Sequence, residues 1–186
     1  MKNIIIFCLA GLTGSGKTSI SEAVAKIGNI ETLIKVTTRP KRSSDLDKEY
    51  RFLSSEEYNK LLRENKFALH TEYYSSHYAV PYSSFEYGKK KNSFTFITPW
   101  NFCNTSFFDP KLSYVKIWLD ISQEERIKRL LKRGDSEEYI NRRLDIEKST
   151  QFSNFFFQQR RQCQVVLDNS DAFEEVVKKM HSMTIQ

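Results

Sequence analysis

The residues best suited to chemistry form a glycine-rich run near the start of the chain. Residues 11–18 have the sequence GLTGSGKT, which satisfies the pattern G-x-x-x-x-G-K-[ST] in full. Backbone N–H groups of such a loop surround phosphate oxygens, while its lysine contacts the β- and γ-phosphates and its last hydroxyl binds Mg²⁺. We therefore predict a site for ATP and Mg²⁺, with Lys17 catalytic and Thr18 as the metal ligand. The nucleotide-binding residues predicted in this run are Gly11, Thr13, Gly14, Ser15, Gly16, Lys17, Thr18 and Ser19.

A second cluster, of basic and hydroxyl-bearing residues, lies between positions 37 and 54. Arg39 and Arg42 are three residues apart, with threonines before them and Tyr50 after them. Two arginines in this arrangement can hold a phosphate, because each guanidinium presents parallel N–H donors. Composition alone would favour a solvated basic loop. Both interpretations stay open on these residues alone.

Strands alternate with helices along most of the chain, and the glycine-rich run joins the first strand to the first helix. Residues 4–9 are a β-branched apolar run that predicts a strand buried on both faces, and residues 18–27 have apolar side chains at helical spacing. Further helices are predicted after the capping residues Ser54, Ser122 and Asp171, and over 136–156. Further strands are predicted at 34–36, 94–97, 115–119 and 165–167. The alternation predicts an α/β sandwich of three layers, with a parallel sheet between helices.

Length and composition narrow the alternatives. The 186 residues allow one domain or one with a small insert, and a hydrophobic content of 39% excludes a disordered chain. The formal charge of +6 favours an anionic partner but falls short of a basic nucleic-acid-binding tail. The three cysteines never form a C-x-x-C pair, so we expect neither a disulfide framework nor a zinc site, and a cytoplasmic location. No later stretch approaches the roughly 18 apolar residues that span a bilayer, so no membrane partner is expected.

The order of the motifs resembles that of the guanylate kinases. The segments VTTRPKR (36–42) and KEYRFLS (48–54) resemble that family's acceptor-binding segment, S-x-T-T-R-x-x-R followed by K-D-Y-x-F-V-S. Residues 67–81 are similar to its F-x-E-W through Y-Y-G-T-P. Residues 129–144, RLLKRGDSEEYINRRL, resemble its lid with one residue fewer, and residues 165–169 resemble its V-V-V-N-D strand end near the adenine. The resemblance covers most of the chain and favours a phosphate site over a solvated loop.

The resemblance implies three parts within one domain. It implies a P-loop core over residues 1–37, 82–128 and 151–186, an acceptor-binding insert over 38–81, and a helical lid over 129–150. The insert also breaks the rhythm of strands and helices, since it is rich in serine, tyrosine and charged residues. We expect the insert to hold the acceptor and the lid to close over the ATP phosphates.

The same resemblance implies roles for side chains outside the glycine-rich run. The side chains expected to hold the phosphate of the acceptor are Arg39, Arg42, Tyr50 and Tyr78. The ATP-binding residues expected in the lid and at the last strand are Arg129, Arg133, Arg143 and Asn169. Because phosphoryl transfer spreads negative charge over oxygens, positioning and fixed cations do nearly all of the catalysis. The predicted catalytic residues are therefore Lys17, Arg39, Arg133 and Arg143.

The positions that contact the base depart from the guanylate kinases. Leu69 stands where the family has a glutamate that accepts hydrogen bonds from guanine, Val80 replaces a hydroxyl, and Lys35 replaces a serine. Guanine donors left without partners would cost about 1–3 kcal/mol each, so efficient use of GMP is not expected.

The carboxylates expected near the metal are also missing. Residues 98–100, TPW, replace the family's D-I-D, so Mg²⁺ would be bound mainly by Thr18, water and phosphates. The predicted acceptor-binding residues are Arg39, Arg42, Tyr50, Leu69, Tyr78, Val80 and Trp100, the last with packing in the core as its alternative.

Taken together, these residues predict an ATP-dependent phosphotransferase related to the guanylate kinases. Its acceptor would be an existing phosphate, on a nucleoside monophosphate other than ordinary GMP or on a sugar phosphate. Four alternatives stay open: a true guanylate kinase, a ribose 1,5-bisphosphate phosphokinase, a kinase of modified nucleic acid, and an inactive binding domain. The lysine run at 89–91 weakly supports the nucleic-acid alternative, and the complete glycine-rich run counts against the inactive one.

Overall fold

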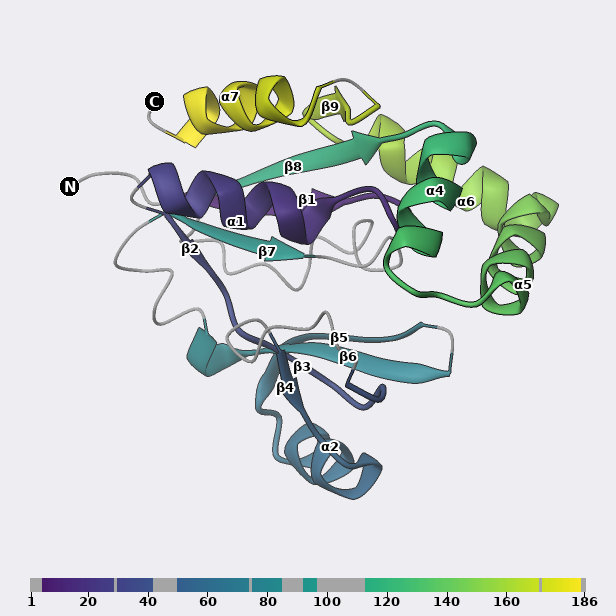
Figure 1. Ribbon diagram of the computed structural model, residues 1–186. Coiled ribbons are helices and arrows are strands. Elements are labelled where there is room, and N and C mark those ends of the chain that lie inside the picture. The colour runs from purple at the N-terminus through teal and green to yellow at the C-terminus, as the bar shows by residue number, and fades with distance from the viewer. Residues whose placement is uncertain are drawn as a thin grey trace.

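The computed structural model describes residues 5–28, 30–41, 50–73, 75–84, 92–96, 113–170 and 172–184, which form two sheets and their flanking helices (Figure 1). The strands are β1 (Ile5–Ala10), β2 (Glu31–Thr32), β3 (Lys35–Thr37), β4 (Tyr50–Phe52), β5 (Phe67–Tyr73), β6 (Ser76–Pro81), β7 (Ser93–Phe96), β8 (Ser113–Asp120) and β9 (Val165–Asp168). The helices are α1 (Lys17–Ile27), α2 (Ser55–Arg63), α4 (Gln123–Lys132), α5 (Glu137–Lys148), α6 (Thr150–Arg161) and α7 (Phe173–Thr184). None of the helices within these ranges is long and apolar enough to cross a bilayer.

The larger sheet has five strands in the order β2-β7-β1-β8-β9, and each neighbouring pair is parallel. Successive side chains of β1 point to opposite faces. Ile6 and Cys8 pack in a cluster with Phe156 of α6, whereas Phe7 and Leu9 pack with residues of α1 and α7. A strand covered on both faces needs apolar residues at successive positions, which the N-terminal run supplies. The predicted three-layer α/β sandwich with a parallel sheet is confirmed (Figure 1).

The smaller sheet has four strands in the order β4-β3-β6-β5 and lies below the larger sheet in Figure 1. Strand β3 is parallel to β4 and antiparallel to β6, and β6 is antiparallel to β5. Helix α2 covers the face of this sheet that points away from the larger sheet (Figure 1). The cluster beneath α2 consists of Val36, Leu53, Tyr58, Phe67 and Ala79. This sheet therefore has one face that packs against its own helix and one that faces the rest of the protein.

The strand predicted over residues 34–36 was wrongly assigned to the larger sheet. Strand β3 pairs with β4 and β6, so the smaller sheet begins at Lys35. The two-residue strand β2 instead takes the edge position beside β7. A three-residue apolar run fits either sheet, and the partners that Val36 finds beneath α2 decide between them.

A single helix over residues 136–156 was also predicted, and the structure has two. Helix α5 ends and α6 begins at Ser149, which has an extended backbone with φ −59° and ψ 140°. The Ser149 hydroxyl accepts a hydrogen bond from the Phe152 N–H and donates to the Ile146 carbonyl oxygen. A serine side chain that satisfies backbone groups on both sides offers the chain a helix end in place of a continued helix.

The predicted helix caps differ in how completely they form. The capping box of Ser54 and Glu57 is complete, with each side chain bonded to the other residue's backbone N–H. Ser122 accepts from the Glu125 N–H, but the Glu125 carboxylate accepts from Arg129 Nε at 3.0 Å. The cap predicted at Asp171 lies outside the described residues.

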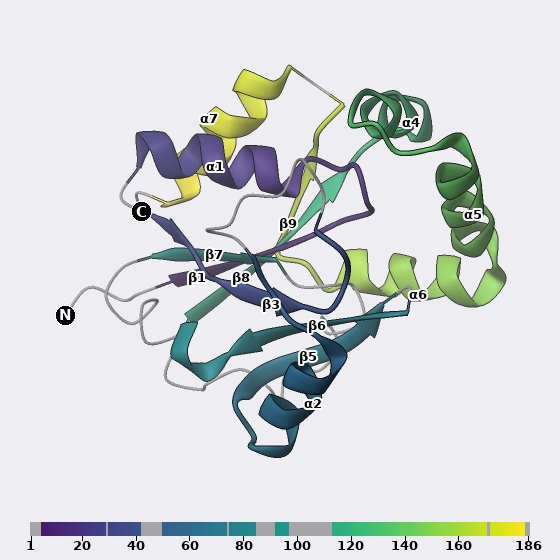
Figure 2. The same ribbon diagram turned by 60° about the horizontal axis from the view of Figure 1, so that its bottom comes forward.

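Helices α4, α5 and α6 lie together at one end of the larger sheet, the end to which the arrows of β7 and β8 point (Figure 1). The turned view in Figure 2 shows the same group beside the ends of both sheets. Ligands of open α/β sheets bind at the carboxyl ends of the strands. These helices are therefore placed next to any ligand of the glycine-rich run.

Candidate active site

The glycine-rich run forms a loop between the carboxyl end of β1 and the first turn of α1. Gly16 is the N-cap of α1, with φ 87°, and makes no side-chain cap hydrogen bond to the first N–H groups of the helix, which are the groups that bind anions at helix N-termini. A Cβ atom at Gly16 would lie 2.4 Å from Asn169 Nδ2, and one at Gly11 would lie 2.6 Å from the Leu119 carbonyl oxygen. Glycine is thus required at both positions, because β8 and the residue after β9 approach the loop closely.

Lys17, the first residue of α1, folds back over the loop. Its Nζ donates to the carbonyl oxygens of Gly11 at 2.9 Å and Leu12 at 3.0 Å. It also lies 3.3 Å from Ser15 Oγ. These contacts place a cation on the loop that would surround a phosphate chain.

The surroundings of Lys17 disfavour its charged form. Burial lowers its pKa from 10.5 to about 7, and the positive charges of Arg133, Arg143 and Arg126 act in the same direction. Well above pH 7, Lys17 of the ligand-free protein is therefore largely neutral. An anionic ligand on the loop would reverse this preference by stabilising the ammonium.

We expect ATP binding at pH 8 to take up about one proton, because ionised phosphates restore the charge of Lys17. Uptake should vanish well below pH 7, where Lys17 is already charged. Affinity for ATP should therefore fall as the pH rises above about 7, since proton and ligand bind together. Calorimetry at pH 8 in two buffers with different ionisation enthalpies measures the uptake. Equal binding enthalpies in the two buffers would show that Lys17 does not change its charge.

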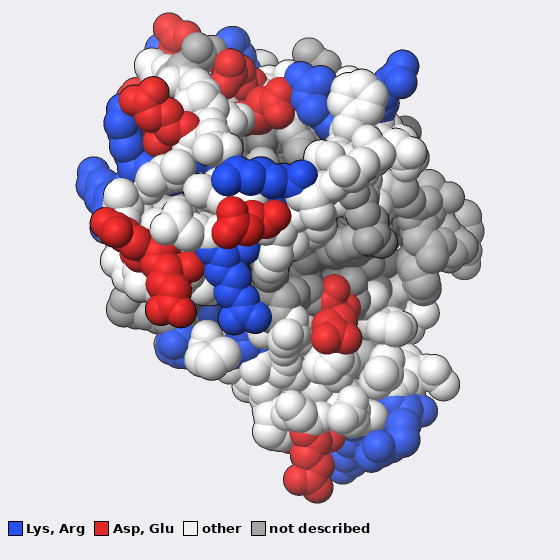
Figure 3. Space-filling model, turned by 90° about the vertical axis from the view of Figure 1, so that its right-hand side faces the viewer, with Lys and Arg blue, Asp and Glu red and all other residues white. Residues whose placement is uncertain are grey.

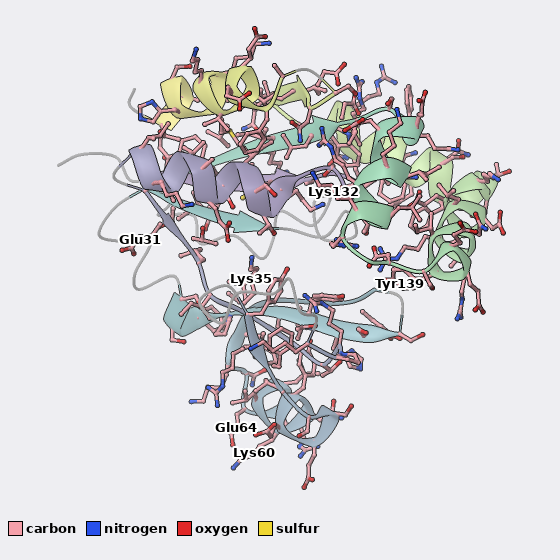
Figure 4. All side chains as sticks on the ribbon, in the orientation of Figure 1. Glu31, Lys35, Lys60, Glu64, Lys132 and Tyr139 are labelled. Atoms are coloured by element: carbon pink, nitrogen blue, oxygen red, sulfur yellow. The ribbon has the colours of Figure 1, made fainter. Side chains whose placement is uncertain are left out.

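Arg143 joins helix α5 to the loop. It is 6% exposed, and its guanidinium donates to Thr13 Oγ1 and to the Tyr139 hydroxyl. The guanidinium also lies 4.4 Å from the centre of the Tyr139 ring. Tyr139, labelled in Figure 4, precedes Arg143 by one helical turn. A predicted catalytic arginine and a predicted ATP-binding residue are thus in contact, although 130 positions separate them.

Arg129 and Asn169 tie helix α4 and the end of β9 to the same loop. Arg129 donates to the Asn169 carbonyl oxygen at 2.7 Å. The Asn169 side chain, fully buried, donates to the Ser15 carbonyl oxygen at 2.7 Å. Both residues were predicted to bind ATP, and the structure brings them together at the loop.

Arg133 lies at the C-terminal end of α4, where it pairs with Asp135. Its Nε is buried and has no hydrogen-bond partner within the described residues. After burial, its charge is the largest cause of the lowered pKa of Lys17. Lys17, Arg133 and Arg143 thus concentrate positive charge around one loop, which would suit a polyphosphate.

An ion pair that no sequence motif indicated lies beside these residues. Arg126 of α4 and Glu147 of α5 are 4% and 9% exposed and lie 2.6 Å apart. They line a pocket of about 190 Å³ with Leu12, Ile121, Gln123, Leu144 and Lys148. One signal in the sequence could have indicated this pair: Arg126 lies four positions before Leu130, on the face of the helix that is buried. The pair fixes α4 against α5 next to the loop.

Two residues in the first half of α1 carry side-chain oxygens of the kind that hard cations prefer. Thr18 lies in the first turn of α1, and Glu22 lies on the same face one turn later. Glu22 Oε1 is buried without a hydrogen-bond partner in the described part of the chain. Among those residues no group of three or more His, Cys, Asp or Glu side chains could form a complete protein cage. Such a set suits Mg²⁺, which keeps several waters and binds phosphate oxygens together with one or two protein ligands.

The predicted acceptor residues lie in the smaller sheet. Arg39, 9% exposed, follows β3, and its guanidinium lies 5.1 Å from the ring of Tyr50 and 5.3 Å from the ring of Phe52. Thr37 and Tyr78 are register partners on β3 and β6, so Tyr78 belongs to the same face as Thr37. The structure therefore places Tyr50 on β4 and Tyr78 on β6, on either side of β3, and Arg39 just after the end of β3.

The positions predicted to contact the base have a different setting. Val80 is 4% exposed and packs in an apolar cluster with Ala68 of β5 and with Ile6 and Cys8 of β1. Leu69 is its register partner on β5. Val80 thus helps to join the two sheets. The predicted acceptor residues Arg42 and Trp100 lie outside the described residues.

Comparison with known proteins agrees with this geometry. A model of a family described as "AAA domain" matches residues 7–151, which include the loop, the smaller sheet and helices α4 and α5. The chain belongs to this AAA domain family. The matched range covers most of the chain, including every described arginine of the candidate site.

Individual relatives are named guanylate kinases. The one from Rickettsia prowazekii is 34% identical over 79 residues, which are 41% of this chain and 40% of that protein. The one from Bartonella henselae is 30% identical over 144 residues, which are 75% of this chain and 64% of that protein. The crystal structure of guanylate kinase from Anaplasma phagocytophilum matches 99% of this chain and 86% of its own, with a TM-score of 0.69 and 22% identity. The sequence-based resemblance and the guanylate kinase-like P-loop fold are confirmed, while the chain matches less than two thirds of the lengths of the two sequence relatives.

Proposed function

We propose that this protein transfers the γ-phosphate of ATP to a phosphate group of a small acceptor. The acceptor would be a nucleoside monophosphate other than ordinary GMP, or a sugar phosphate. The observation that carries the proposal is the contact of Arg143 with Thr13, which brings a cation onto a loop that already holds Lys17. Cations supplied from two separate parts of the chain suit a reaction that brings two anions together.

The loop, α4 and α5 would bind the donor. The N–H groups at the start of α1 and the Lys17 ammonium would contact the β- and γ-phosphates, and Arg133 and Arg143 would contact the γ-phosphate. The chain from Arg129 through Asn169 to Ser15 would hold the loop in shape. Mg²⁺ at Thr18 would neutralise part of the charge on the phosphates.

The smaller sheet would bind the acceptor. Arg39, with the hydroxyls of Tyr50 and Tyr78, would hold the acceptor phosphate so that one of its oxygens faces the γ-phosphorus. That oxygen forms a bond to the γ-phosphorus while the bond from phosphorus to the β,γ-bridging oxygen breaks, which gives ADP and a diphosphate on the acceptor. An ionised phosphate is already a nucleophile, so the step needs no general base.

A coupled assay of ADP release over nucleoside monophosphates and ribose phosphates tests the proposal. We expect turnover of at least one acceptor, with GMP a poor one. A folded protein that binds ATP and yet turns over none of these acceptors would contradict the proposed transfer.

Substitution of Arg39 tests the acceptor side. In Arg39→Ala we expect KM for the acceptor to rise and kcat to fall, by about tenfold or more together, because a charged contact to the acceptor phosphate is lost. KM for ATP should change little. Arg51→Ala is the matched control, since Arg51 is exposed on the neighbouring strand β4. If Arg39→Ala and Arg51→Ala changed KM and kcat equally, Arg39 would not be the residue that binds the acceptor phosphate.

Two further features support the proposal in its details. On the one face that Figure 3 shows, the Lys and Arg side chains of the described residues lie beside Asp and Glu, so this face has no continuous basic surface of the kind that suits nucleic acid. Cys8 and Cys163 are free thiols, which supports a cytoplasmic location.

A further inference from the structure

Lys35 is a buried lysine in the middle of the candidate acceptor-binding sheet. It is 3% exposed and is the first residue of β3. Lysine is among the residues least often fully buried in proteins. In the guanylate kinase resemblance this position is a serine among those that contact the base, and the resemblance does not explain a lysine there. Its place in the sheet therefore needs an explanation of its own.

The alternation along β3 determines which way Lys35 points. Val36 packs beneath α2 with Tyr58, so Lys35 and Thr37 project from the opposite face. In Figure 4 the Lys35 side chain points toward the larger sheet, whereas Lys60 and Glu64 lie at α2 on the far side. Lys35 is thus on the face that would receive the acceptor.

A second cation lies on the same face. Lys35 Nζ is 4.4 Å from the centre of the Tyr50 ring, and the Arg39 guanidinium is 5.1 Å from the centre of that ring. Lys35 and Tyr50 are also register partners on β3 and β4. The electron-rich face of an aromatic ring attracts cations, so Tyr50 helps to hold both side chains in this face of the sheet.

We infer that Lys35 selects acceptors that carry a second oxyanion besides the phosphate that receives the phosphoryl group. An ammonium offers three donors and no acceptor, so it can bind carboxylate or phosphate oxygens but cannot satisfy the N–H groups of guanine. With Arg39 on one oxyanion and Lys35 on the other, the face suits a bisphosphate or a phosphorylated carboxylic acid. This inference rests on the proposed function and narrows its acceptor class.

The test compares Lys35→Met with Lys60→Met. Methionine is close to lysine in length but carries no charge, and Lys60 is an exposed lysine of α2 (Figure 4). The probes are ribose 1,5-bisphosphate and 3-phosphoglycerate, which have a second phosphate and a carboxylate respectively. Ribose 5-phosphate and GMP are the probes without a second oxyanion. Calorimetry with a non-hydrolysable ATP analogue present measures binding, and ADP release measures turnover.

For the intact protein we expect ribose 1,5-bisphosphate or 3-phosphoglycerate to bind more tightly than ribose 5-phosphate. Lys35→Met should raise the dissociation constant of the more tightly bound probe about tenfold or more, because one charged hydrogen bond is lost. In Lys35→Met the dissociation constants of ribose 5-phosphate and of the ATP analogue should change less than about twofold. Lys60→Met should bind every probe as the intact protein does. Thermal unfolding of both variants checks that they fold.

Two results separate this inference from the proposed function. Equal binding of every probe to the intact protein and to Lys35→Met would overturn the role of Lys35 and leave phosphoryl transfer standing. Tight, Lys35-dependent binding of a doubly anionic probe without any turnover would support the role of Lys35 and count against transfer. Tighter binding of GMP than of either doubly anionic probe would also overturn the inference.

Discussion

Replacement of Lys17 by alanine should abolish phosphoryl transfer. The Lys17 ammonium lies within 3.0 Å of two carbonyl oxygens of the loop, so it is already positioned where a phosphate chain would sit. Its charge would stabilise the γ-phosphate as negative charge shifts toward the β,γ-bridging oxygen. We expect kcat to fall by about a hundredfold or more, because one preorganised donor at such a site is worth that much.

Lys26→Ala is the matched control for Lys17→Ala. Lys26 lies in the last turn of the same helix and is exposed, so its removal should leave kcat within about twofold. Thermal unfolding should show that both variants fold. If Lys17→Ala kept more than half of the original kcat, the loop would have no part in the phosphoryl transfer.

Replacement of Arg143 by alanine should lower kcat by about a thousandfold, as the loss of an arginine finger does in related chemistry. Arg143 reaches the loop from α5, is buried, and has its guanidinium held by the Tyr139 ring and hydroxyl. A planar guanidinium fixed in this way can contact two oxygens of the transferring phosphoryl group at once. Arg143→Lys should restore little, because an ammonium lacks the paired donors.

Arg142→Ala is the control for Arg143, because Arg142 is the preceding residue of α5 and is exposed. Its kcat should stay within about twofold of the original. The split between kinetic constants separates two roles of Arg143. A residue that only fastens α5 to the loop would change the dissociation constant for ATP and leave kcat alone, whereas a catalytic arginine lowers kcat.

The parts of the fold that were predictable carry a strong local signal. The pattern at 11–18 placed the loop between a strand and a helix, because only glycine fits where β8 and Asn169 approach it. The buried strand β1 and the capping box at Ser54 were found for similar reasons, since burial on two faces and paired backbone hydrogen bonds restrict residue types strongly.

The parts that were not predictable depend on contacts distant in sequence. Strand β3 joined the smaller sheet because Val36 found its partners beneath α2, and a three-residue run carries no such information. The break at Ser149 came from one side chain bonding to the backbone on both sides, within an otherwise helical pattern. The pair of Arg126 and Glu147 joins two helices and matches no motif.

The candidate site follows the same division. The resemblance of residues 129–144 to a lid identified Arg129, Arg133 and Arg143 as site residues. It could not identify the residues that they contact. Contacts such as Arg143 with Thr13 depend on how α4 and α5 pack over the loop. The burial of Lys35 was also invisible in the sequence, because an isolated lysine in a short strand normally indicates a solvated edge.

Transfer of a radiolabelled γ-phosphate from ATP to an acceptor tests the central claim most directly. The label should appear in the acceptor as a diphosphate, with ADP formed in equal amount, and the transfer should disappear in Lys17→Ala. Two results would contradict the account. One is label that is recovered only as inorganic phosphate. The other is ATP that the protein binds but that stays intact with every phosphorylated acceptor.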